Sequence, residues 1–118
     1  MKPNVIKNAV TVTASLFLGL TLSVPTQAAI VESSSALITS ITSFSEYGGG
    51  DVVVKIANPV TGCEAGHWLR PADPGFDRNV ALLMSAYLAN RPVKIYSHNN
   101  QIWPGSSGKY CLVDLVSI

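Results

Sequence analysis

The amino-terminal segment constrains the fold most, because it has the composition of a secretory signal and leaves little chain for a folded domain. Lys2 and Lys7 are its only charged residues, the stretch from Ala9 to Val24 is mostly apolar, and small residues stand at Thr26 and Ala28. Signal peptidase recognises a short basic start, an apolar segment and small residues at positions −3 and −1 of the cleavage site. We therefore expect a secreted or periplasmic protein that is cleaved after Ala28.

On this prediction, residues 1–28 are a signal peptide and residues 29–118 form a single domain. A retained membrane anchor is the alternative, but hydroxyl side chains interrupt the apolar stretch, which is shorter than the roughly 20 residues that cross a bilayer. Removing 28 of the 118 residues leaves 90, which is room for one domain.

The charge of the remaining chain excludes two classes of partner. It has six basic and seven acidic residues, a net charge of −1, without a cluster of Lys and Arg. Nucleic acids and anionic lipid surfaces are both bound through several positive charges. We therefore expect no nucleic-acid partner and, once the signal has been cleaved, no membrane attachment.

Cys63 and Cys111 are the only cysteines. An even number of cysteines in an oxidising compartment predicts a disulfide, and closing a loop of this length is worth roughly 4 kcal/mol in the chain-entropy model. The alternatives are two free buried thiols, or half of a metal site completed by His67 and His98. No closely spaced pair of metal ligands supports a metal site, so we expect neither a metal nor a cofactor.

Five segments have the β-branched and apolar composition of strands. They are residues 36–44, 51–57, 63–69, 93–96 and 110–118. Glycines 48–50 between Tyr47 and Asp51 predict a turn, and the polar residues 97–108 predict a loop.

One segment has helical periodicity. Its apolar residues recur at the spacing of an amphipathic helix; they are Val80, Leu83, Met84, Tyr87 and Leu88. Asp77 is expected to cap the helix start, and Pro92 forbids continuation beyond Asn90. We expect the helix over Asp77–Asn90, with Met84 and Tyr87 either in the core or at a subunit interface.

The expected order is therefore β-β-β-α-β-β, a mostly β domain with one helix and one disulfide. This is the order of strands and helix in the oligonucleotide/oligosaccharide-binding (OB) fold, a small barrel. An α+β open sheet with one packed helix fits nearly as well and remains the alternative.

The carboxy-terminal half resembles a known family over about residues 51–118. The resemblance is carried by Cys63 followed by Trp68, by A-Y-L-A-N at 86–90, by R-P-V-K-I-Y at 91–96 and by the closing Y-C-L-V-D-L-V-S-I. These features are similar to those of receptor-binding B subunits of AB5 toxins, in particular the subtilase-cytotoxin type, and of related small uncharacterised secreted proteins of Gram-negative bacteria.

The resemblance implies an OB-type domain, often a pentamer, with glycan recognition on its loops. The matching positions are structural ones, which specify fold better than function. The glycan-contacting residues of the toxin subunits match no motif of this chain, so none is carried over.

The segment from His98 to Trp103 is the first candidate binding site. Amide side chains offer paired donors and acceptors for sugar hydroxyls, and an indole offers an apolar face to a sugar ring. The residues are His98, Asn99, Asn100, Gln101 and Trp103. The alternative is that the amides build a turn while Trp103 covers the core.

Tyr47 and Asp51, which flank the three glycines, form a second candidate site, with an ordinary hairpin turn as the alternative. Catalysis has little support, because the chain lacks the G-x-S-x-G, H-E-x-x-H and phosphate-loop motifs. A histidine paired with a serine is conceivable, but nothing in the sequence orients such a pair.

The sequence thus predicts a secreted, non-catalytic domain that binds a glycan or a protein ligand and can form a homo-oligomer. A periplasmic structural or inhibitor-type protein that acts through protein–protein contact is the alternative.

Overall fold

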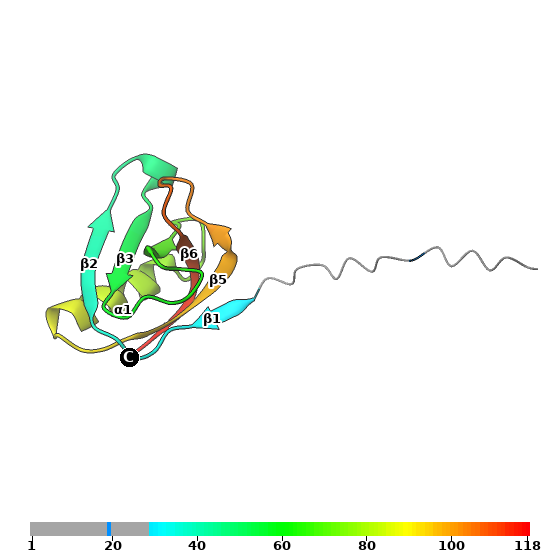
Figure 1. Cartoon of the computed structure of the whole chain (residues 1–118). Coiled ribbons are helices and arrows are strands. Elements are labelled where there is room, and N and C mark those ends of the chain that lie inside the picture. Colours follow the sequence, from blue (N-terminus) through cyan, green and yellow to red (C-terminus); the bar gives the residue numbers. More distant parts are fainter. Residues whose placement is uncertain (1–18, 20–28) are drawn as a thin grey trace, which may run out of the picture.

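Figure 1 shows the computed structural model of the chain, which describes residue 19 and residues 29–118. Apart from Gly19, the expected signal peptide lies outside the described residues. The elements are β1 (Ile30–Glu32), β2 (Ile38–Ser43), the 3-10 helix η1 (Tyr47–Gly49), β3 (Val52–Ile56), β4 (Gly66–Leu69), α1 (Phe76–Leu88), β5 (Lys94–Ile102) and β6 (Tyr110–Ser117).

The six strands form one mixed sheet in the order β1-β5-β6-β4-β3-β2. Neighbouring strands are antiparallel except β4 and β6, which are parallel. A mostly β domain with one α-helix is therefore confirmed. The elements from β2 to β6 have the expected order β-β-β-α-β-β, and the short strand β1 precedes them. Because β1 and β2 are the two edges of the sheet, the strand order describes an open sheet and not a closed barrel.

The segment that joins β1 to β2 is also bonded to the chain around the start of β5. The amide of Ser33 donates to the carbonyl of Ile95 at 2.8 Å, and Ala36 and Val93 exchange two backbone hydrogen bonds of 3.0 and 2.8 Å. The start of β2 is thus tied to the start of β5, across the open side of the sheet (Figure 1).

α1 packs against one face of the sheet and completes the main core. Leu83 and Ala86 are its buried residues. The strands and their flanks contribute the inward-facing apolar side chains Ala36, Ile38, Val52, Val54, Ile56, Leu69, Val93, Ile95, Val113 and Val116.

A second, smaller core lies on the opposite face of the sheet. Successive residues of a strand point to opposite faces, so Val53 and Trp68 belong to this second core whereas Val54 and Leu69 belong to the main one. Its members are Val53, Trp68, Trp103 and Leu112, with Phe44 and Tyr110 packed against them.

The helix differs from the prediction at both ends. It begins at Phe76 after Gly75, so Asp77 lies in the first turn and does not cap it. It ends at Leu88, because Asn90 takes a left-handed conformation (φ 53°) and the amide of Arg91 bonds the carbonyl of Ala86. An asparagine at this position is a common helix stop.

The buried face of the helix also differs. Of the five apolar residues that predicted it, Leu83 is fully buried, but Met84, Tyr87 and Leu88 are 50%, 47% and 81% exposed. The expectation that Met84 and Tyr87 lie in the core of one chain is therefore wrong, and their role in a subunit interface stays a prediction.

The strands differ from the sequence prediction in three places. The third expected strand begins at Gly66 and not at Cys63, because Gly66 has φ 140° and a Cβ there would lie 2.5 Å from the carbonyl oxygen of Val54. β5 continues to Ile102, so residues 97–102 are strand and not loop. The chain from Ala29 onward adds β1, which pairs with β5 and was not expected.

Candidate functional site

Two adjoining clefts lie on the side of the sheet where η1, the loop after β4 and the end of β5 meet. The first, called the aromatic cleft here, has a volume of about 380 Å³. It is lined by Tyr47, Gly48, Asp51, Trp68, Arg70, Ala72 and Pro104. The second, called the polar cleft, has a volume of about 270 Å³ and is described below.

The glycine turn positions Tyr47 and Asp51 in the aromatic cleft. The amides of Gly50 and Asp51 both donate to the carbonyl of Tyr47, at 3.0 Å each. Gly48 has φ 63°, and a Cβ there would lie 2.0 Å from Oδ2 of Asp51. A side chain at position 48 would therefore displace the carboxylate, so the turn requires a glycine at this position.

Asp51 is a buried carboxylate that is only partly satisfied. Its side chain is 2% exposed, and Oδ2 accepts a hydrogen bond of 2.9 Å from Nε1 of Trp103. Within residues 29–118, no group donates to Oδ1. A buried acceptor without a partner is costly, and because Oδ1 is itself buried, a ligand in the cleft does not reach it in this structure.

Trp103 is a core residue that packs behind the aromatic cleft. Its side chain is 5% exposed, and its ring makes edge contacts with Tyr47 and Tyr110 at 5.5 Å between centroids. The expected role of Trp103 as an exposed platform is therefore wrong, and the alternative that it covers the core describes its position. Because its N–H is used by Asp51, it orients the carboxylate.

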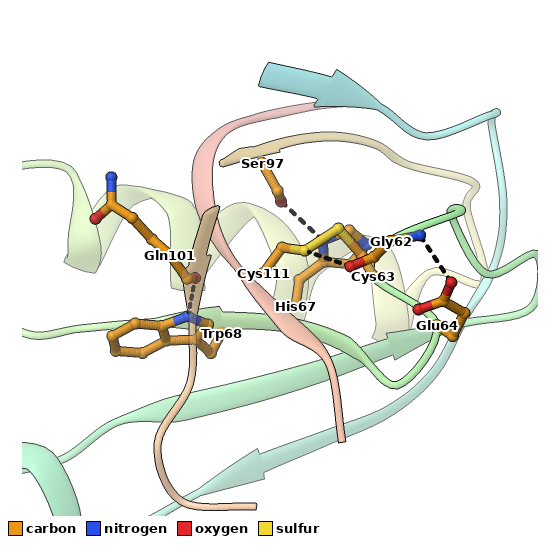
Figure 2. The surroundings of a disulfide bond; sticks show 8 residues. All are labelled: Gly62, Cys63, Glu64, His67, Trp68, Ser97, Gln101 and Cys111. Atoms are coloured by element: carbon orange, nitrogen blue, oxygen red, sulfur yellow. Dashed lines mark hydrogen bonds between the residues drawn. A yellow bond between two sulfur atoms is a disulfide. The ribbon is translucent and has the colours of Figure 1, made fainter. Parts of the chain in front are cut away.

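Tyr47 and Trp68 supply the aromatic walls of the cleft. Tyr47 is 45% exposed, which leaves much of its ring accessible. Trp68 is 8% exposed, and its Nε1 donates to the backbone carbonyl of Gln101 at 3.0 Å (Figure 2). In Figure 2 the side chains of Trp68 and Gln101 extend to the same side, away from the disulfide.

The polar cleft lies between the start of α1 and strands β5 and β6. An ion pair and a hydrogen bond lie in its wall: Nε of Arg70 pairs with Oδ1 of Asp73 at 2.8 Å, and Nε2 of His98 is hydrogen-bonded to Oδ1 of Asp114 at 3.1 Å. The full lining is Leu69, Arg70, Asp73, Pro74, Gly75, Phe76, Asn79, His98, Gln101, Leu112, Val113 and Asp114. The lining of the polar cleft therefore combines hydrogen-bond donors and acceptors with apolar side chains such as Leu112.

The residues of the first predicted binding site, His98 to Trp103, do not lie together in the structure. His98 and Gln101 line the polar cleft. Trp103 is buried behind the aromatic cleft, beside Asp51. Asn99 and Asn100 line neither cleft, and the amide of Asn99 bonds the carbonyl of Ala29 beside β1. The second candidate pair, Tyr47 and Asp51, stays together in the aromatic cleft.

A buried histidine and serine lie behind the clefts, next to the disulfide. Nδ1 of His67 and Oγ of Ser97 are 2.7 Å apart, and both residues are 0% exposed (Figure 2). Burial lowers the pKa of His67 from its ordinary value of 6.5 to about 4, since a charged imidazole is poorly solvated there. With no access to solvent, this pair is a structural contact and not a site that a substrate reaches.

The disulfide joins Cys63, just before β4, to Cys111 in β6, with the two Cα atoms 5.4 Å apart (Figure 2). The pairing predicted from the cysteine count is confirmed. Such a bond is typical of a non-reducing compartment. Within residue 19 and residues 29–118, no helix is long and apolar enough to cross a membrane. The same residues contain no group of three side chains placed to hold a metal ion.

Comparisons of the chain with protein families, with curated proteins and with solved structures gave no match. The function is therefore inferred from the clefts themselves.

Sequence reasoning missed several residues of the clefts. Arg70, Asp73 and Asn79 lie in the loop after β4 and in the first turns of α1, whereas Asp114 lies in β6. No local spacing links them. The R-P-A-D-P stretch from position 70 was the one available signal, because two prolines hold a short charged loop between a strand and a helix.

Proposed function

We propose that the chain is a secreted, non-catalytic binding domain whose aromatic cleft recognises a glycan. The observation that carries this proposal is the accessible ring of Tyr47, which is 45% exposed and lines one cleft with Trp68 and the 43% exposed side chain of Arg70. A sugar needs directional hydrogen bonds to its hydroxyls and an apolar surface for its ring, and this cleft offers both.

The charges of the aromatic cleft favour a neutral ligand. Asp51 contributes one carboxylate and Arg70 one guanidinium, so the lining has no net formal charge. The carboxylate accepts hydrogen bonds, the guanidinium donates them, and a hydroxyl group can do either. A polyhydroxylated ligand therefore complements both groups, whereas a simple cation or anion complements only one.

The position of the cleft on the fold gives further support. We propose that the sheet curls into an OB-like barrel, because the hydrogen bonds between Ala36 and Val93 tie the start of β2 to that of β5. The parallel pairing of β4 with β6, and the helix between β4 and β5, agree with that topology. OB folds bind oligosaccharides on their second and third strands and on two neighbouring loops.

The aromatic cleft lies at the corresponding place. The second and third strands of an OB barrel would be β3 and β4, and its binding loops would be those between β2 and β3 and between β5 and β6. Tyr47 comes from the first of these loops, Pro104 from the second, and Trp68 from β4. This likeness is one of fold, so the side chains of the cleft carry the functional argument.

The direct test is binding of the purified exported protein to an array of immobilised glycans. Tyr47→Ala should weaken binding about tenfold through loss of the stacking surface. Arg70→Ala should weaken it as well, because it removes the hydrogen-bond donor of the cleft whose side chain is 43% exposed. Tyr87→Ala is the matched control, since Tyr87 is 47% exposed and Tyr47 is 45% exposed, and Tyr87 lines neither cleft.

Absence of binding to every glycan on the array would overturn the proposal. So would binding that survives Tyr47→Ala and Arg70→Ala in variants whose circular dichroism is unchanged.

Protein–protein contact is the second candidate function, and one observation favours it. The outer side of α1 exposes Met84, Tyr87 and Leu88 together. Exposed apolar patches of this kind often mark interaction surfaces. On this candidate, which includes the pentamer expected from the family resemblance, light scattering should give a mass several times that of one chain. Tyr87→Ala should lower that mass and Tyr47→Ala should not.

A further inference from the structure

We propose that the aromatic and polar clefts form one extended site, which takes an oligosaccharide of at least two sugar units. The inference rests on the glycan-binding function proposed above and specifies the ligand of that site. One sugar would occupy the aromatic cleft, and the next would lie over the polar cleft.

Arg70 connects the two clefts, because its side chain lines both of them. Nε of Arg70 donates a hydrogen bond of 2.8 Å to Oδ1 of Asp73, which holds the guanidinium in place. Within residues 29–118, Asp73 is its one hydrogen-bond acceptor, so the terminal N–H groups of Arg70 are free for a ligand. The side chain is 43% exposed. A ligand that spans the clefts would pass directly over these donors.

The second connection is the hydrogen bond between Trp68 and Gln101. Trp68 lines the aromatic cleft and Gln101 the polar cleft, and the bond from Nε1 to the backbone carbonyl joins the two walls. Because the bond uses the backbone of Gln101, its side-chain amide stays available in the polar cleft (Figure 2). The two clefts are thus parts of one continuous, fixed surface.

The chemistry of the polar cleft suits a second sugar. Asn79 and Gln101 each carry an amide that both donates and accepts, and the contacts with Arg70 and His98 hold Asp73 and Asp114 in the wall of the cleft. The clefts have volumes of about 270 and 380 Å³. Each lies near the lower end of the range of about 300–1,000 Å³ that is typical of ligand pockets, so neither alone would enclose much of an oligosaccharide.

The experiment compares sugars of increasing length on the full exported protein. The probes are glucose, galactose, mannose and N-acetylglucosamine, each as monomer, linear dimer and linear trimer, with affinities measured by calorimetry. For at least one sugar, the dimer or trimer should bind about tenfold more tightly than the monomer. The double variant Asn79→Ala, Gln101→Ala should remove that gain and leave monomer binding unchanged. Arg78→Ala, next to Asn79 on α1 but in neither cleft, should bind all three lengths as the parent does.

The other possible results of this experiment each contradict a specific part of the proposal. Equal affinity for monomer, dimer and trimer, or a trimer affinity that the double variant leaves intact, would overturn the extended site and leave glycan binding at the aromatic cleft standing. Loss of monomer binding in a folded double variant would also overturn the division into two parts. Failure of all twelve probes to bind, in a protein that also binds nothing on the glycan array, would overturn the proposed function and the extended site together.

Discussion

Acid should destabilise the folded domain through His67. This imidazole is fully buried in β4, its Nδ1 is bonded to Ser97, and its Nε2 has no partner in the described residues. Protonation would place a charge in the interior with nothing to accept the new hydrogen bond. Folding therefore holds the pKa of His67 at about 4, below the ordinary value of 6.5.

The sign and the size of the effect follow from this difference. Between pH 6.5 and pH 4 the unfolded chain binds a proton that the folded chain does not, so the stability is complete above pH 6.5 and falls as the pH drops through this interval. Each tenfold change in the protonation equilibrium corresponds to about 1.4 kcal/mol. The free energy of unfolding should accordingly fall by about 2–3 kcal/mol between pH 7.5 and pH 4.5.

The assay is urea unfolding, followed by circular dichroism, at several values of pH for the parent and for His67→Gln. Glutamine does not titrate and can still hydrogen-bond to Ser97, so the variant should lose much less stability on acidification. The carboxyl groups are the same in both proteins, and the difference between the two curves isolates His67.

Parallel loss of stability in the two proteins would refute the reasoning. If His67→Gln does not fold, the NMR titration of the His67 ring in the parent decides the matter, because a ring that titrates near its ordinary pKa contradicts the structure.

Three further predictions concern stability. Replacing both Cys63 and Cys111 by serine should lower the free energy of unfolding by roughly 4 kcal/mol, as measured by urea unfolding; a double variant that melts within a few degrees of the parent would show that the disulfide is dispensable. Leu83→Ala should cost about 2–5 kcal/mol through the cavity it leaves, whereas Met84→Ala, on the exposed side of α1, should be nearly silent in the same measurement. Trp103→Phe should cost at least about 1–3 kcal/mol, because it removes the hydrogen bond to Asp51, and a thermal melt that is unchanged would contradict the assigned contact.

Local composition predicted most of the fold. Strands β2 and β3 are rich in β-branched residues and β6 is mostly apolar, so their existence was visible in the sequence, and the paired cysteines predicted the disulfide. β5 was predicted only as far as Tyr96, because His98, Asn99, Asn100 and Gln101 have poor strand propensity. His98 pairs with β1 and β6, and Ile102 pairs with β6, so the residues between them are held within β5 at both ends in spite of their composition.

The buried side of α1 was not predictable from its apolar spacing. The apolar residues form a stripe that is wider than the surface the sheet covers, so Leu83 is buried and Leu88 is left in the open. Which part of such a stripe meets the sheet depends on the angle of the helix across β2 and β6, and a single segment of sequence does not encode this angle.

The candidate site was predictable in its parts but not as a whole. The turn glycines pointed to Tyr47 and Asp51, and the amide-rich segment pointed to Gln101. The register shift in β5 between His98 and Ile102 determines that Trp103 turns inward while Gln101 stays at the surface. The hydrogen bond between Asp51 and Trp103 spans 52 residues, and no local pattern indicates such a contact.

The central position of β6 has a consequence for the order in which the protein can fold. β6 comes after the other five strands in the sequence, yet it lies between β4 and β5 and carries Cys111. Until residues 110–117 have been synthesised, β5 and β4 lack the strand that lies between them, and the bridge between Ala36 and Val93 is the remaining backbone link described between β5 and the start of β2. The complete sheet and the native pairing of Cys63 therefore both require residues 110–117. A fragment of this domain that stops before β6 should form neither.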